Sequence, residues 1–162
     1  MHKLDIDLDK STNKHSISMW NILLWILLGI YLLFVFYLTL FAWNYGSSYG
    51  PVGPGGRHYN LVLFRSIYNI TMYSGNWEQP LRILGGNVLM FIPFGILTSL
   101  LMKEGVKTVV TVTFFSFLLS FFIEMNQFIF TYRVANVDDL LLNTIGGLLG
   151  ALFIFFCRYL KP

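Results

Sequence analysis

Residues 20–42 read WNILLWILLGIYLLFVFYLTLFA and contain no Asp, Glu, Lys or Arg. A helix rises about 1.5 Å per residue, so a run of this length crosses the roughly 30 Å hydrocarbon core of a bilayer. The run is too long for the apolar part of a signal peptide, and no small-residue cleavage site follows it. We therefore predict a transmembrane helix that anchors the chain.

Three further runs, at residues 84–102, 108–130 and 140–157, have the length and apolar character of transmembrane helices. The composition agrees, because 56% of the 162 residues are hydrophobic and only 12% are charged, whereas about a quarter of an ordinary soluble domain is charged. This composition excludes a soluble globular domain, and no tract of Lys and Arg indicates nucleic-acid binding. The predicted fold class is an all-α polytopic membrane protein, a bundle of four transmembrane helices.

The distribution of Lys and Arg predicts the orientation of this bundle. Seven basic residues lie on the side of the two chain ends: Lys3, Lys10, Lys14, Lys103, Lys107, Arg158 and Lys161. Four lie on the other side: Arg57, Arg65, Arg82 and Arg133. Because cytoplasmic segments carry the excess of basic residues, we predict cytoplasmic tails at 1–19 and 158–162, a membrane domain at 20–157 and an external loop at 43–83.

The predicted external loop has two parts of different character. Residues 46–56, GSSYGPVGPGG, are too rich in Gly and Pro for a helix or a strand. Residues 59–73, YNLVLFRSIYNITMY, are too few and too polar to span a bilayer but apolar enough to lie at its surface. We predict an interfacial or re-entrant segment here, with a plain loop packed on the bundle end as the alternative.

Glu124 is the residue that a membrane span explains least, because a carboxyl group inside a span costs about 2.5 kcal/mol or more. It belongs to a stripe of polar residues that recur every three or four positions: Thr113, Ser116, Ser120, Glu124, Gln127 and Thr131. Such a stripe faces protein or water rather than lipid. Small polar residues let helices approach closely, which favours a packing role for Thr113, Ser116 and Ser120. Glu124 and Gln127 are candidate site residues.

A second stripe follows in the last run: Asp139, Asn143, Gly146 or Gly147, and Gly150. We predict that Gly146 and Gly150 let this helix pack closely on the preceding one, so that Asn143 approaches Glu124 and Gln127. One of Asp138 and Asp139 is predicted to cap the start of its own helix.

Asn87 and Arg133 complete the candidate site. Asn87 either caps the start of the second predicted helix or points inward at the depth of Asn143. Arg133 is a suitable partner for Glu124 or an Asp, and a guanidinium can also grip a phosphate. The expected cluster near the external face comprises Asn87, Glu124, Gln127, Arg133, Asp138, Asp139 and Asn143.

Four motifs in this order carry a resemblance to a known family: NLVLFRSI at 60–67, NVLMFIPFG at 87–95, SFFIEMNQ at 120–127 and RVANVDDLLLNTIGGLLG at 133–150. They resemble the patterns N-L-x-P-F-x-x-I, N-x-x-x-F-I-P-F-G, I-E-x-x-Q and R-x-x-D-x-D-D-x-x-x-N-x-x-G-G-x-x-G of the VanZ-like family of bacterial membrane proteins. The resemblance adds Asn60 and Phe64 to the candidate binding residues. Leu63 stands where the family usually has Pro, and Asn136 stands where an Asp is common.

The resemblance implies a protein of the bacterial cytoplasmic membrane with a role in resistance to teicoplanin-type glycopeptides and lipoglycopeptides. The expected partners are membrane lipids, and further a lipid-linked cell-wall precursor or a lipoglycopeptide bound at the polar cluster. The alternative is an intramembrane enzyme acting on a lipid-linked substrate, with Glu124 as the acid or base and Arg133 holding a phosphate. A third interpretation is that the cluster only joins helices. No spacing of ligand residues predicts a metal or cofactor.

Overall fold

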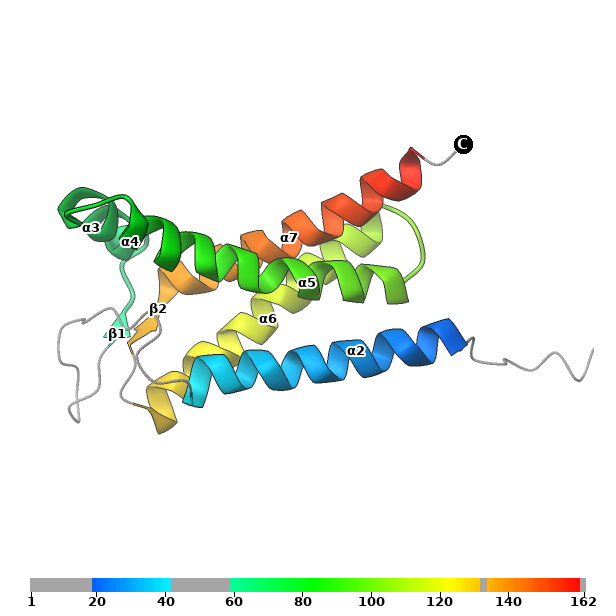
Figure 1. The fold of residues 1–162 in the computed structure, drawn as a ribbon, viewed down its shortest axis with the longest axis horizontal. Coiled ribbons are helices and arrows are strands. Elements are labelled where there is room, and N and C mark those ends of the chain that lie inside the picture. Colours follow the sequence, from blue (N-terminus) through cyan, green and yellow to red (C-terminus); the bar gives the residue numbers. More distant parts are fainter. Residues whose placement is uncertain (1–18, 42–58, 132–133, 161–162) are drawn as a thin grey trace, which may run out of the picture.

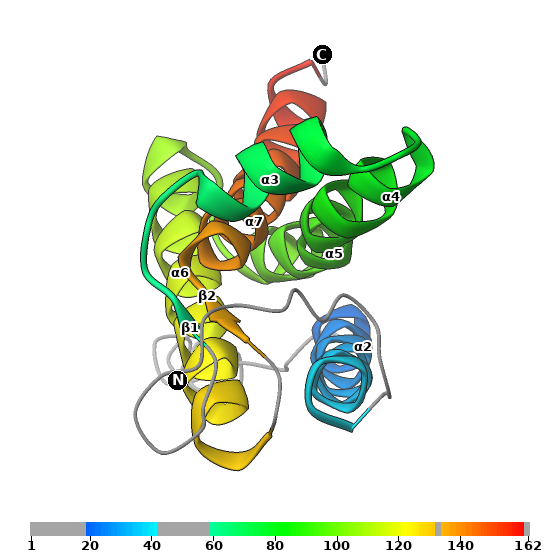
Figure 2. The same ribbon diagram turned by 90° about the vertical axis from the view of Figure 1, so that its left-hand side faces the viewer.

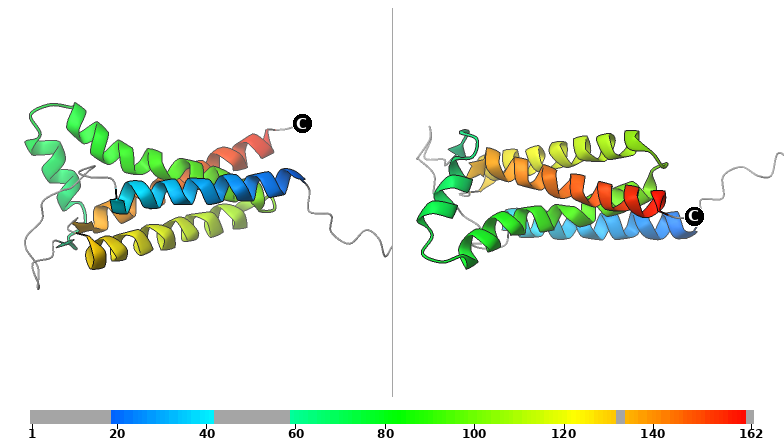
Figure 3. Two further views of the ribbon diagram at one scale, coloured as in Figure 1. Left: turned by 60° about the horizontal axis from the view of Figure 1, so that its bottom comes forward. Right: turned by 90° about the horizontal axis from the view of Figure 1, so that it is seen from above.

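The computed structural model describes residues 19–41, 59–131 and 134–160. Its four long helices lie side by side in an elongated bundle (Figure 1). Their bounds are α2 (Met19–Phe36), α5 (Gly86–Leu101), α6 (Val106–Phe130) and α7 (Val137–Tyr159). The smaller elements gather at one end of the bundle, as the two views in Figure 3 also show. They are β1 (Tyr59–Asn60), α3 (Arg65–Tyr73), α4 (Glu78–Pro80) and β2 (Ala135–Asn136).

Four helical segments are long and apolar enough to cross a bilayer: Met19–Phe41, Glu78–Leu101, Val106–Phe130 and Val137–Tyr159. Large apolar side chains are exposed along their outer faces, for example Trp25, Phe114 and Phe153. A surface of this kind is suited to lipid and would drive aggregation in water. The chain is therefore a polytopic membrane protein, as the sequence predicts.

The second span begins earlier than its apolar run indicates. Helical structure starts at Glu78 and continues through a π-helical turn, Leu81–Gly85, into α5. Pro80 fits there because the first turn of a helix does not use its backbone N–H groups. The loop that precedes this span therefore ends before Glu78, and not at residue 83 as predicted. Asn87 lies inside a continuous helix, which excludes its predicted alternative role as a cap.

Glycines set the distance between α7 and its two neighbours, α5 and α6 (Figure 2). A Cβ atom added to Gly146 would lie 2.2 Å from the carbonyl oxygen of Val88, and one on Gly150 would lie 2.2 Å from that of Ile92. The predicted close packing is therefore present, but these two glycines face α5. Gly147 faces α6 instead, because successive residues of a helix point about 100° apart.

Helix α5 also packs on α2, around a small apolar core. Val35, Phe91 and Ile123 are almost fully buried there, one from each of α2, α5 and α6. The Tyr31 hydroxyl donates a hydrogen bond to the carbonyl oxygen of Met90. Together these contacts join the first span to the rest of the bundle.

A short parallel ladder and a surface helix close one end of the bundle. Strands β1 and β2 pair Tyr59 with Ala135 and Asn60 with Asn136. Helix α3 lies across this end (Figure 2), and none of its residues is buried. The segment predicted to be interfacial therefore forms β1 and α3. Its placement at a membrane surface stays a prediction.

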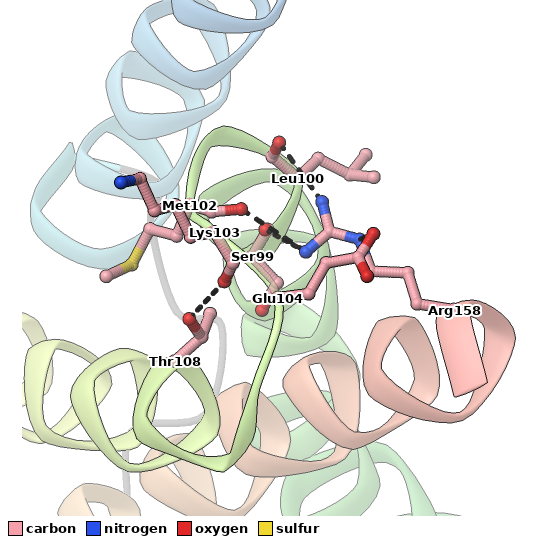
Figure 4. Close-up of polar contacts among 7 residues, drawn as sticks. All are labelled: Ser99, Leu100, Met102, Lys103, Glu104, Thr108 and Arg158. Atoms are coloured by element: carbon pink, nitrogen blue, oxygen red, sulfur yellow. Dashed lines mark hydrogen bonds and ion pairs between the residues drawn. The ribbon is translucent and has the colours of Figure 1, made fainter.

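Arg158 holds the opposite end of the bundle together (Figure 4). Its guanidinium donates to the carbonyl oxygens of Ser99, Leu100 and Met102 over 3.2, 3.5 and 3.3 Å. The last carbonyls of a helix have no partner within that helix, so this contact satisfies the C-terminus of α5. The Glu104 carboxylate lies 3.7 Å from the same guanidinium.

Candidate binding site

Asp138 connects α7 to the start of α3. Its fully buried carboxylate accepts hydrogen bonds from the backbone N–H groups of Phe64, Ser66 and Ile67 over 2.5, 2.7 and 3.2 Å. Helix α3 has no capping side chain of its own, since Phe64 stands at its N-cap in a left-handed conformation with φ of 65°. Asp138 therefore supplies the cap from a distant part of the chain.

Asn136 caps α7, so the prediction that Asp138 or Asp139 does so is wrong. The Asn136 side-chain oxygen accepts from the backbone N–H of Asp138 over 3.1 Å. The physical reason is the ladder: pairing with Asn60 keeps Asn136 extended, and the helix begins directly after it. The same oxygen also accepts from the Asn60 amide over 3.0 Å.

Asn136 also joins two acidic residues of the predicted cluster. Its backbone N–H donates to Glu124 Oε2 over 2.7 Å, and its side-chain amide donates to Asp139 Oδ1 over 3.1 Å. An aspartate at this position has no hydrogen to donate to Asp139. Sequence reasoning did not place Asn136 among the site residues. The available signal was its departure from the family motif.

A cavity of about 530 Å³ opens between the ends of all four spans at this end of the bundle. We call it the polar cavity. Its charged and amide lining comprises Arg82, Asn87, Glu124, Gln127, Asp139 and Asn143. Its other walls are largely apolar and include Phe34, Leu89 and Met90. The cavity thus combines an apolar wall with a small set of convergent polar groups, as ligand sites commonly do.

Both π-helical turns of the described chain border this cavity. Leu38 and Thr39 come from the turn at Tyr37–Phe41, and Arg82 and Ile83 come from the turn at Leu81–Gly85. π-Helical turns are rare and occur often at functional sites. Their placement on two helices around one cavity is a second feature that marks this end of the bundle.

The three amides of the polar cavity are held by hydrogen bonds from their nitrogens. Asn87 donates to Asp139 Oδ1, Gln127 donates to the carbonyl oxygen of Thr39, and Asn143 donates to the Ser120 hydroxyl, each over 2.9 Å. When the nitrogen of an amide donates in this way, the orientation of the amide is fixed and its oxygen remains as an acceptor. Among the described residues the buried Oδ1 of Asn143 has no hydrogen-bond partner. The lining is therefore rich in acceptors.

Comparison with known proteins gives this arrangement a family. Residues 21–158 match the sequence profile described as VanZ/LLP1. The chain belongs to the VanZ/LLP1 family. It is 32% identical over 126 residues to Protein VanZ of Enterococcus faecium, an alignment that covers 76% of this chain and 68% of that protein. No solved structure matches the chain.

The family stretch contains every residue that lines the polar cavity. Five of the predicted site residues line this cavity: Asn87, Glu124, Gln127, Asp139 and Asn143. Asn60 and Asp138 belong instead to the hydrogen bonds that fix β1, β2 and α3.

The remaining two predicted site residues are Phe64 and Arg133, and Phe64 does not line the polar cavity. Phe64 is 56% exposed and contributes its backbone N–H to Asp138. Arg133 lies outside the described residues. Within residues 19–41, 59–131 and 134–160, no group of three His, Cys, Asp or Glu is arranged to hold a metal ion.

Proposed function

We propose that this protein binds the headgroup of an amphiphile in the polar cavity and thereby lowers the susceptibility of a bacterium to teicoplanin-type glycopeptides. The candidate amphiphiles are a lipid-linked cell-wall precursor and an acylated glycopeptide. The observation that carries the proposal is the cavity itself, which places acceptors and carboxylates beside an apolar wall at one end of the spans. Membership of the VanZ/LLP1 family supports the antibiotic part of the proposal.

The basic residues support an external position for the polar cavity. Three basic residues lie at the end of the bundle opposite the cavity: Lys103 on the loop between α5 and α6, Lys107 in the first turn of α6, and Arg158 near the end of α7. The end that carries such residues tends to face the cytoplasm. In this orientation both chain ends are cytoplasmic, and the cavity opens toward the side where wall precursors and glycopeptides are found.

The lining favours a headgroup that donates hydrogen bonds. The described lining contains the carboxylates of Glu124 and Asp139 and the amides of Asn87 and Gln127, against one guanidinium, that of Arg82. Carboxylates and amide oxygens accept hydrogen bonds and repel a phosphate. Hydroxyl, amide and ammonium groups, which sugars and peptides carry, therefore suit this cavity better than a bare phosphate does.

A second candidate function is acid or base catalysis on a lipid-linked substrate. The specific observation in its favour is that Glu124 and Asp139, two carboxylates, line the same cavity within a membrane domain. Ionisable groups inside membranes are functional by default. Against catalysis, Glu124 already accepts a hydrogen bond from the backbone of Asn136, which gives it a structural partner.

The test is tolerance to teicoplanin in a susceptible host that expresses the protein. Gln127→Ala removes a cavity amide, whereas Asn126→Ala removes a neighbouring amide that lies outside the polar cavity and donates to its own helix at Phe122. We expect Gln127→Ala to lower tolerance and Asn126→Ala to preserve it at equal protein levels. Equal tolerance for both variants contradicts the proposal.

Two controls sharpen this experiment. A glycopeptide without an acyl chain reports whether the effect requires an amphiphile. Purified protein incubated with a labelled lipid-linked precursor separates the two functions, because saturable binding without a change in the lipid supports a binding protein. A covalent change in the lipid that disappears in Glu124→Gln supports the enzyme.

A further inference from the structure

A second cavity of about 440 Å³ lies on the other side of Glu124. Its lining is almost entirely apolar and includes Leu61, Phe121, Met125, Phe128, Val137 and Leu140. Glu124 and Asn136 complete its wall. We call this space the apolar chamber.

The apolar chamber is continuous with the lipid-facing surface of the bundle. Phe121 and Met125 line it from α6 and are 48% and 41% exposed. They belong to the exposed face of α6 that lies off its polar stripe, the kind of face that a membrane span turns to lipid. Leu61, at the end of the chamber next to β1, is also exposed. A hydrocarbon chain can therefore enter from the bilayer without crossing water.

The apolar chamber and the polar cavity share one residue and one hydrogen-bonded connection. Glu124 lines both spaces. Asn136 lines the chamber, holds Glu124 through its backbone N–H, and donates its amide to Asp139 of the polar cavity. A molecule in one space thus lies against the residues that shape the other.

We propose that the apolar chamber binds an acyl chain of the amphiphile whose headgroup occupies the polar cavity, and that this chain enters laterally from the bilayer beside α6. The identity of the amphiphile rests on the proposed function, whereas the acyl-chain site rests on the chamber and its continuity with the lipid-facing surface. The ligand class is therefore an acylated molecule rather than a free sugar or peptide.

A photoreactive fatty acid tests the site directly. Palmitic acid carrying a diazirine is added in increasing amounts to the purified protein in phosphatidylglycerol nanodiscs, irradiated, and located by mass spectrometry. We expect saturable labelling of Phe121, Met125 and Phe128, and labelling of lipid-facing residues such as Phe153, which is 57% exposed, that rises in proportion to the probe. Proportional labelling at all of these positions indicates annular lipid only and overturns the proposal.

A matched pair of variants on α6 provides an independent measurement. Met125 and Leu118 are each 41% exposed, but only Met125 lines the apolar chamber. A Trp at 125 fills the chamber mouth, so we expect Met125→Trp to weaken the saturable labelling roughly tenfold, the factor for about two methylene groups left unburied. Leu118→Trp should leave it unchanged. Equal effects of the two substitutions overturn the proposal.

Failure of this inference differs from failure of the proposed function. If Met125→Trp weakens labelling and teicoplanin tolerance does not depend on the protein, the acyl-chain site stands and the proposed function fails. If Gln127→Ala lowers tolerance while no saturable labelling of the chamber occurs, the proposed function stands and the acyl-chain site fails. The labelling experiment on the unmodified protein decides the inference even if a variant fails to fold.

Discussion

The carboxylate of Asp138 accepts the backbone N–H of Ser66 over 2.7 Å, across 72 positions of sequence. Because the first N–H groups of a helix have no partner within it, this contact satisfies the start of α3 from the start of α7. The surface helix is thereby fixed to the membrane bundle by a buried acid. No residue of α3 is itself buried, so this carboxylate is a main determinant of where the helix lies.

Asp138→Ala should release α3 from the bundle. It leaves three backbone donors without their acceptor, which costs about 2 to 4 kcal/mol. We expect faster hydrogen exchange at residues 65–73, while exchange within α5 and α6 changes little. Glu78→Ala is the control, because the ion pair of Glu78 with Arg82 is exposed and contributes less than about 1 kcal/mol. Unchanged exchange in α3 contradicts the capping role.

The four spans are predictable from the sequence because apolar length is a local property. Residues 20–42 need no partner to be recognised, and the spacing of Ser116, Ser120 and Glu124 already defines the buried face of α6. The start of the second span is less predictable. Gln79 and Pro80 are not part of an apolar run, yet they form the first turn of that helix.

The site is only partly predictable because its contacts join distant segments. An acid at the start of a helix is a normal cap of that helix, and nothing local shows that Asp138 binds α3 instead. Likewise the spacing of Gly146 and Gly150 predicts close packing, but the arrangement of the bundle determines that the neighbour is α5. Asn136 was missed because its role depends on β1, Glu124 and Asp139 together.

Asn136→Asp tests what the amide at position 136 contributes to this network. The substitution keeps the acceptor for Asp138 but loses the donor to Asp139. We expect the protein to lose about 1 to 3 kcal/mol of stability, because the half-buried Asp139 carboxylate keeps the Asn87 donor but loses the Asn136 donor and meets a like charge instead. The measurement is thermal unfolding in detergent.

Asn76→Asp is the control for this substitution. The Asn76 side chain accepts from the backbone N–H of Gln79 in an exposed position, and an aspartate there keeps the acceptor and favours the helix N-terminus. We expect its unfolding temperature to stay the same or rise slightly. A similar loss for both variants would show that the charge alone, and not the Asp139 contact, explains the effect.

Gly147→Ala should disrupt the packing of α7 on α6. A Cβ at this position would lie 1.8 Å from the Ser116 hydroxyl oxygen and 2.4 Å from its Cβ. We expect a loss of about 1 to 3 kcal/mol or more, the usual cost of overpacking. Because both clashing atoms belong to one side chain, adding Ser116→Gly should restore most of the stability, and Ser116→Ala should restore less.

Gly29→Ala serves as the matched control on α2, where an added Cβ meets no atom within 4 Å. Its unfolding temperature should equal or slightly exceed that of the unmodified protein. If Ser116→Gly does not restore the stability of the Gly147→Ala variant, the contact between α6 and α7 does not explain why position 147 requires glycine.

The orientation of the bundle can be tested with single cysteines in a Cys157→Ala background, since Cys157 is exposed. Gly75→Cys places a thiol next to α3, at the end that holds the polar cavity, and Lys103→Cys places one at the opposite end. The excess of basic residues at the second end predicts that it faces the cytoplasm. A membrane-impermeant maleimide added to intact cells should therefore label position 75 and not position 103, and permeabilised cells should show both. Labelling of position 103 alone in intact cells would show that the bundle has the opposite orientation. The polar cavity would then face the cytoplasm, without access to external glycopeptides.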